Sequence, residues 1–154
     1  MGLYFDELSL GQQFESSSRV LTAYDVKKFA ELTGDFNRLH LDNEYAKTTE
    51  FKRPISHGLL ILGVAFGLWY ALGITADTII AFIGINKLSF KSPAFPGDTI
   101  RLKTKVAAKR ESKSRPDAGI VTFNDLVINQ DESVVLEFER VLLLKKKGSR
   151  ARAL

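Results

Sequence analysis

The chain of 154 residues is 45% hydrophobic and 26% charged, a composition that fits one globular domain with a single core. It contains no cysteine, which excludes disulfide bridges, a cysteine-ligated zinc site and a thiol nucleophile, and favours a reducing compartment. The formal net charge is +4, but five basic residues lie in the last ten positions, and without them 17 basic residues face 18 acidic ones. A body this close to neutral lacks the basic face of a nucleic-acid-binding protein.

The start of the sequence is not expected to act as a targeting signal. The first residues, MGLYFDELSLGQQ, lack the basic region and apolar run of a signal peptide, and Asp6 stands where an N-myristoylation motif has Ser or Thr. The basic tail of residues 145–154 is expected to be a disordered, solvated end, with a phosphate-attracting arm as the alternative. We therefore expect one domain over residues 1–144, located in the cytoplasm, that binds neither nucleic acid nor membrane.

The first part of the chain predicts an interrupted strand and two short helices. Residues 11–21 alternate between apolar and polar side chains and are broken by three serines. Residues 22–34 predict an amphipathic helix, because Thr22 and Asp25 form a capping-box pattern and Gly34 provides a stop. A second helix is expected through NEYAKTT, capped by Asp42.

Residues 55–75 contain no charged side chain and predict the central helix. Their apolar run, residues 59–72, is 14 residues long. This is shorter than the ~20 residues that cross a bilayer. A helix that is apolar on all sides but too short to span a membrane is expected to be buried in protein. Ser56 is the expected N-cap and Gly73 the expected stop.

The rest of the chain predicts four long strands, rich in β-branched and aromatic residues and bounded by turn signals. Their spacing is that of successive hairpins, with a Pro-Gly-Asp turn after the first strand, and it predicts an antiparallel sheet. The sheet is expected to wrap around the apolar helix in an α+β fold. Gly63 and Gly67 are expected to allow the sheet to pack closely, with the lining of an acyl channel as the alternative. The predicted strands are residues 79–90, 99–110, 119–129 and 133–144.

Three motifs lie between these elements: GDFNRLHLD at 34–42, RPISHGLL at 53–60 and LSFKSPAFPGD at 88–98. Together they resemble the MaoC-like, (R)-specific enoyl-CoA hydratase and dehydratase family, over the chain from about residue 10 to about residue 144. The resemblance implies a hot-dog fold, a homodimer whose sheet continues across the two subunits, a thioester substrate and a role in fatty-acid metabolism. Arg38 stands where that family very often has proline, which is expected to loosen the turn around it.

The resemblance further implies that Asp35 and His40 are catalytic. Hydration of a trans-2-enoyl-CoA requires an activated water, a proton for the α-carbon and stabilisation of the enolate-like thioester oxygen. A carboxylate and an imidazole that converge on one water would supply the first two, near neutral pH and by syn addition. Gly58, in the first turn of the central helix, would offer a free backbone N–H to the oxygen. The expected product is (3R)-3-hydroxyacyl-CoA, with no metal and no cofactor other than the coenzyme A of the substrate.

Each of these residues also has a structural explanation. Asp35 fits an Asx-turn after the helix, and His40 fits a packed loop residue. Asn37 would either orient the catalytic pair or form the turn, while Ser56 and His57 would either shape the oxyanion site or serve the helix end and the core. Two histidines and one aspartate are also metal-ligand types, but the Asp35 to His40 spacing is not helical ligand spacing.

Two other functions stay open from the sequence. Hot-dog thioesterases and hydroxyacyl-carrier-protein dehydratases often place an acidic residue on the central helix, whereas residues 55–76 contain neither Asp nor Glu. A non-catalytic acyl-CoA-binding partner subunit is the second alternative. The presence of Asp35, His40 and Gly58 argues against it.

Overall fold

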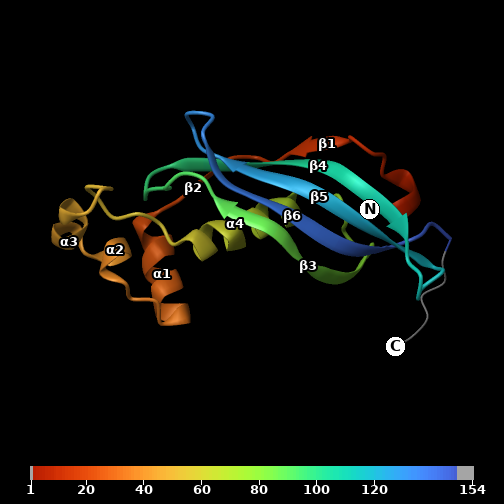
Figure 1. Cartoon of the computed structure of the whole chain (residues 1–154), viewed down its shortest axis with the longest axis horizontal. Helices are drawn as coiled ribbons and strands as arrows, with labels where there is room; N and C mark the ends of the chain where they lie inside the picture. The colour runs from red at the N-terminus through yellow and green to blue at the C-terminus, as the bar shows by residue number, and fades with distance from the viewer. Residues whose placement is uncertain (1, 149–154) are drawn as a thin grey trace.

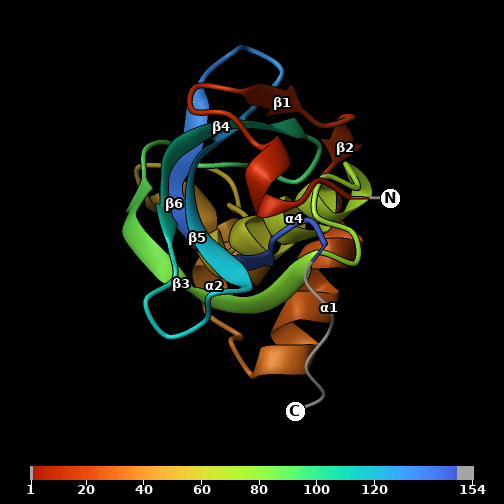
Figure 2. The same ribbon diagram turned by 90° about the vertical axis from the view of Figure 1, so that its right-hand side faces the viewer.

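The computed structural model describes residues 2–148, in which an antiparallel sheet curves around one central helix (Figure 1, Figure 2). Helices α1, α2 and α3 lie together at one end of the molecule, toward which the N-terminus of the central helix points (Figure 1). The helices are η1 (Phe5–Glu7, a 3-10 turn), α1 (Ala23–Thr33), α2 (Arg38–Leu41), α3 (Asn43–Thr48) and the central α4 (Gly58–Ala71). The strands are β1 (Gln13–Glu15), β2 (Arg19–Val20), β3 (Ile79–Phe90), β4 (Thr99–Glu111), β5 (Ala118–Ile128) and β6 (Val134–Lys145).

The predicted caps position the short helices. The Thr22 hydroxyl accepts from the Asp25 N–H at 3.0 Å, and the Asp25 carboxylate accepts from the Thr22 N–H at 2.8 Å. Gly34 ends α1 in the left-handed conformation, with φ of 79°. The Asp42 carboxylate caps α3 by accepting from the Tyr45 N–H at 2.9 Å. These local expectations are confirmed, whereas α2 was not predicted.

The order of the strands differs from successive hairpins. Within the sheet the order is β1-β4-β5-β6-β3, with β2 on β4, so β3 pairs with β6 and not with β4. The expected hairpin between β3 and β4 is therefore wrong. The Pro-Gly-Asp turn instead bonds to Leu21, the residue that follows β2. Gly97 N–H donates to Leu21 O at 2.6 Å, and Leu21 N–H donates to Asp98 O at 2.8 Å. The segment between β3 and β4 thus leads from the edge strand β3 to the far side of β5 and β6.

The central helix α4 buries one face and leaves the other open. Ile61, Ala65 and Trp69 are buried against the sheet, as expected of the core. On the opposite face Leu59 and Tyr70 are 60% and 82% exposed, so the expectation of a helix buried on all sides holds for only one face. No helix in residues 2–148 is long and apolar enough to cross a membrane.

Gly63 and Gly67 lie on the open face of α4. Both are exposed, and a Cβ placed at either would meet no atom within 4 Å. The expectation that they allow the sheet to pack closely is therefore wrong.

A buried ion pair joins the neighbouring strands β5 and β6 beside α4. Arg140 Nε lies 2.7 Å from Asp125 Oδ2, and the two side chains are 1% and 0% exposed. The Arg140 guanidinium also lies over the Phe66 and Trp69 rings, at 4.1 and 4.4 Å from their centroids. Burial lowers the pKa of Arg140 and raises the pKa of Asp125, because a low-dielectric interior disfavours both charges.

The folded part of the chain continues past residue 144. Lys145 ends β6 and donates its N–H to Thr78 O at 2.9 Å, and Lys147 pairs with Glu7 at 2.7 Å. The domain boundary expected at residue 145 therefore falls inside ordered structure. The remainder of the expected disordered tail, residues 149–154, lies outside the described residues.

Candidate active site

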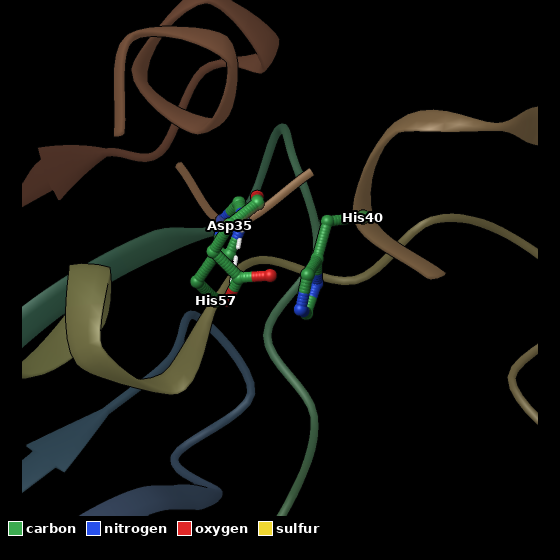
Figure 3. Close-up of side chains that lie close together, drawn as sticks. All are labelled: Asp35, His40 and His57. Carbon is green, nitrogen blue, oxygen red and sulfur yellow. Dashed lines mark hydrogen bonds and ion pairs between the residues drawn. The ribbon is translucent and has the colours of Figure 1, made fainter. Parts of the chain in front are cut away.

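Three segments surround a cavity of about 510 Å³ at the N-terminus of α4. They are the connection from α1 to α2, the residues that lead into α4, and the crossing segment after β3. Five of the six predicted site residues line this cavity: Asp35, His40, Ser56, His57 and Gly58. Figure 3 shows the Asp35, His40 and His57 side chains gathered at one place although they come from separate parts of the sequence.

Asp35 follows the left-handed Gly34 that ends α1. Its Oδ1 accepts from the Asn37 main-chain N–H at 3.3 Å, which is the Asx-turn considered from the sequence. The Asn37 side chain turns away to cap α2 by accepting from the Leu39 N–H at 3.0 Å. The Asp35 side chain remains 50% exposed at the cavity. The turn therefore orients the carboxylate and does not remove it from the site.

His40 lies on α2, and a main-chain carbonyl fixes its tautomer. Its Nδ1 is 2.8 Å from Ile55 O, and because a carbonyl can only accept, Nδ1 carries the hydrogen in the neutral ring. Nε2 is then left with a free lone pair. A histidine held in this way can accept a proton from a water in the cavity.

His57 is buried and contacts both Asp35 and His40. Its side chain is 2% exposed, and its Nε2–H donates to the main-chain oxygen of Asp35 at 3.0 Å. The His40 ring stacks on it at 3.8 Å between centroids, and Phe29 packs against it at 4.9 Å. The distance of 4.0 Å from Nε2 to Asp35 Oδ2 is too long for a hydrogen bond. His57 therefore holds the Asp35 segment through its backbone, and the role expected for it at the oxyanion site stays a prediction.

Burial decides the charge of His57. Removal from water lowers its pKa most, the nearby His40 lowers it further, and the Asp35 carbonyl opposes the shift. His57 Nδ1 is buried and has no hydrogen-bond partner among residues 2–148. A proton on Nδ1 would be a buried charge without a partner, so the ring stays neutral near pH 7.

The first turn of α4 presents uncapped N–H groups to the cavity. The helix begins at Gly58, and its N-cap is His57, which makes no capping hydrogen bond with its side chain. The expected N-cap, Ser56, is therefore wrong: its N–H donates to Ala94 O at 2.7 Å, and its buried Oγ has no partner in the described chain. The positive end of the helix dipole lies behind these groups, so the site favours an oxygen that gains negative charge.

Phe90, at the end of β3, explains why residue 58 is glycine. A Cβ at Gly58 would lie 2.5 Å from Phe90 Cε1, so any other residue would collide with this ring. Phe90 is half exposed and lines the cavity together with Ile61. The sequence motifs missed Phe90 and the Ile55 carbonyl that holds His40. Phe90 does lie within the LSFKSPAFPGD motif, whereas the Ile55 contact uses only the backbone and leaves no side-chain signal.

Asp35, His40 and His57 are also the candidate metal ligands. One ligand atom from each lies within 4.8 Å of the others. However, His57 Nε2 donates to a carbonyl and His57 Nδ1 is buried, so only Asp35 and His40 offer accessible ligand atoms. Two protein ligands fall short of the three or four usual for zinc. The geometry thus fits a water-binding pair better than a metal site.

The fold and the site define a hot-dog protein with an aspartate and a histidine over the N-terminus of its central helix. The MaoC like domain matches residues 7–127, and the chain belongs to this MaoC-like dehydratase family. It is 36% identical over 137 residues to the (R)-specific enoyl-CoA hydratase of Aeromonas caviae, across 89% of this chain and 96% of the relative.

The fold is similar to that of two solved structures. The MaoC-like dehydratase of Rhodospirillum rubrum matches with a TM-score of 0.85 at 31% identity, over 96% of this chain and 100% of the other. A Mycobacterium tuberculosis protein described as having a double hot-dog fold matches with a TM-score of 0.85 at 25% identity, over 99% of this chain and 47% of that one.

Proposed function

We propose that the protein catalyses the reversible hydration of trans-2-enoyl-CoA to (3R)-3-hydroxyacyl-CoA. The observation that carries the proposal is that the Asp35 carboxylate, the His40 ring and the Gly58 backbone line one cavity. The similar protein from Aeromonas caviae is named as an (R)-specific enoyl-CoA hydratase, which supports the same chemistry and configuration. This reaction would place the protein in fatty-acid metabolism.

The Asp35 carboxylate and His40 Nε2 are the proton-handling groups of the proposed reaction. Both accept hydrogen bonds from one water, which aligns its oxygen with C3 of the enoyl group. The water oxygen bonds to C3, the C2–C3 double-bond electrons shift toward the thioester, and the pair delivers the released proton to C2. The hydroxyl of the water ends on C3 and its other hydrogen on C2. No oxidant, reductant or group donor is involved, so the reaction needs no cofactor beyond the coenzyme A of the substrate.

The Gly58 N–H is proposed to stabilise the thioester oxygen while it carries the enolate charge. Loss of one such donor in other enzymes costs ~3 kcal/mol of transition-state stabilisation. The acyl chain would lie along the apolar wall formed by Leu59, Ile61 and Phe90. This arrangement places the reacting carbons between the helix terminus and the Asp35 and His40 pair.

A homodimer is part of the proposal. The edge strand β3 and the open face of α4 both expose apolar side chains, with Phe82 and Ile83 of β3 49% and 52% exposed. An unpaired edge strand beside such side chains is a template for a second copy. Sedimentation at micromolar concentration is expected to show a dimer, and a monomer would contradict this part. A cytoplasmic location also stays a proposal, for which the absence of cysteine is the argument.

The test is the loss of ultraviolet absorbance of the conjugated thioester when protein is added to crotonyl-CoA and to a longer homologue. We expect hydration without release of free thiol. Thiol release would instead support a thioesterase, and binding of the thioester without turnover would support the non-catalytic subunit. If Asp35→Asn and His40→Ala each leave the hydration rate unchanged, the assignment of the pair is wrong.

The same assay tests the expected independence from metal ions. After dialysis against a chelator the hydration rate should be unchanged, because the proposed mechanism assigns no step to a metal. Loss of activity that a divalent cation restores would assign Asp35 and His40 to a metal site.

A further inference from the structure

A second cavity, of about 440 Å³, also includes His40 in its lining. It is bounded by α1, by the α2 to α3 region and by the segment that leads into α4. His40 lines both this cavity and the one that contains Asp35 and Gly58. The two cavities are therefore adjacent at the His40 side chain.

Two cations without ion-pair partners border the second cavity. Lys27 on α1 and Arg53 before α4 are exposed, and neither has a carboxylate within 4.0 Å among residues 2–148. The neighbouring Lys28 differs, because its Nζ pairs with Glu31 at 2.9 Å. The residues that line the cavity include no Asp or Glu. The formally charged side chains that line the second cavity are therefore both positive.

The orientation of Arg53 suits an anion. Its guanidinium carbon lies 3.8 Å from the centroid of the Phe95 ring. A guanidinium stacked by its face keeps its N–H donors in the plane, where they can reach a phosphate. Stacking on the ring also reduces the freedom of the side chain, which lowers the entropic cost of binding.

The walls of the second cavity are mostly apolar. Val26, Pro54 and Pro96 contribute to them, and Asn43 adds one amide. Such walls suit a slender chain of methylene and amide groups. Between the two cations and the shared His40, the cavity therefore combines a site for a phosphate with a site for an amide-containing chain.

We propose that the second cavity binds the 4′-phosphopantetheine handle of the thioester, with Lys27 and Arg53 on its phosphate. This inference rests on the proposed hydratase function and adds the place where the handle binds. Coenzyme A and acyl carrier protein both provide this chemical group, so the experiment separates them. Neither Lys27 nor Arg53 has a part in the reaction at C2 and C3.

Steady-state hydration of three thioesters tests the proposal: crotonyl-CoA, crotonyl-4′-phosphopantetheine and crotonyl-pantetheine. The parent protein should show a higher KM for crotonyl-pantetheine, which lacks the phosphate. Lys27→Gln and Arg53→Gln should each raise the KM for crotonyl-CoA about fivefold, which corresponds to the ~1 kcal/mol of an exposed ion pair. In the double variant the KM advantage of the phosphorylated thioesters should largely disappear.

Matched variants control for a general loss of positive charge. Lys28→Gln, on the same helix as Lys27, and Lys52→Gln, beside Arg53, each remove one charge outside both cavities. They should leave the KM for crotonyl-CoA close to that of the parent. Equal effects in the control and test variants would overturn the proposal, as would equal KM values for phosphorylated and unphosphorylated thioesters in the parent.

Calorimetric titration separates this inference from the proposed function. The parent should bind 4′-phosphopantetheine more tightly than pantetheine, and the Lys27→Gln/Arg53→Gln double variant should remove most of the difference, whether or not the protein hydrates crotonyl thioesters. Binding that discriminates without turnover would retain the handle site and reject the hydratase. Tighter binding of coenzyme A than of 4′-phosphopantetheine would identify the free coenzyme as the source of the handle, whereas equal affinity would favour a carrier protein.

Discussion

The two halves of the site are built in different ways. The segment from Gly34 to Asp42 is largely exposed. Apart from the bond of His40 to Ile55 O and that of Asp35 O to His57, its hydrogen bonds mostly join close neighbours, such as the Asn37 N–H and Asp35 Oδ1. The segment at Ser56 and His57 is buried and held by distant partners, at Ala94 and at Asp35 itself. Reactive groups need access to substrate, so we infer that the exposed half carries the chemistry and that the buried half keeps it in place.

The largest expected effect is at the exposed half. Asp35→Asn should lower kcat for hydration by about 10²- to 10⁴-fold, the usual contribution of a general acid or base. The free energy of unfolding should change by less than ~0.5 kcal/mol, because the amide keeps the turn and the side chain is half exposed. Kinetics and urea denaturation check both numbers. A variant that loses stability in proportion to its activity would show that Asp35 is structural.

The next effect is at the start of α4. Gly58→Ala should destabilise the protein by about 1–3 kcal/mol, because the new methyl group overlaps Phe90. In a Phe90→Ala background the same substitution should cost much less, since the ring is gone. Thermal denaturation of the single and double variants measures the difference. An equal cost in both backgrounds would mean that Phe90 is not the reason for the glycine.

A smaller effect is expected at His57. His57→Leu removes the hydrogen bond to the Asp35 carbonyl and should cost ~1 kcal/mol of stability and about tenfold in kcat. His57→Gln can still donate to that carbonyl and should recover most of the activity, with little change in KM for either variant. If glutamine is no better than leucine, the bond to Asp35 does not position the catalytic segment.

The same residue predicts a pH dependence of stability. Burial lowers the pKa of His57 from its ordinary value of 6.5, so below that pH the unfolded chain takes up a proton more readily than the folded protein. The free energy of unfolding should therefore fall as the pH decreases from 7.5 to 5.5. The fall should be smaller in His57→Gln, while His40 and Asp35, which face the ring, are present in both proteins. Equal falls would contradict the assignment.

The smallest effect concerns Arg38, which pairs with Asp42 at 2.9 Å. Because Arg38 is the first residue of α2 and Asn37 before it has ψ of 129°, proline fits this position. Arg38→Pro should gain ~0.4–1 kcal/mol from a stiffer unfolded chain and lose a similar amount with the exposed ion pair. A change in unfolding free energy well beyond 1 kcal/mol would show that the Arg38 pair determines the turn.

The sequence predicted what local signals determine. The caps at Thr22 and Asp42, and the position of Asp35 and His40 in one short segment, follow from residues within a few positions of each other. The pairing of β3 with β6 could not be predicted in this way, because Phe90 and Leu136 meet only through the folded sheet.

Two further features of the structure could not be predicted from the periodic pattern of apolar residues. Apolar residues all around α4 do not tell whether a sheet or a second copy covers each face, and the structure shows the sheet on one face only. The bonds from His40 to Ile55 O and from His57 to Asp35 O use main-chain carbonyls, which every residue possesses. The sequence therefore indicated the residues of the proposed reaction but not the contacts that hold them.

The most direct test of the central claim is the kcat of the double variant Asp35→Asn/His40→Ala for crotonyl-CoA hydration. If the two side chains act as a unit on one water, the double variant should be no more than about threefold slower than the slower single variant. Rate losses that multiply would show that the carboxylate and the imidazole act independently and would contradict the shared water.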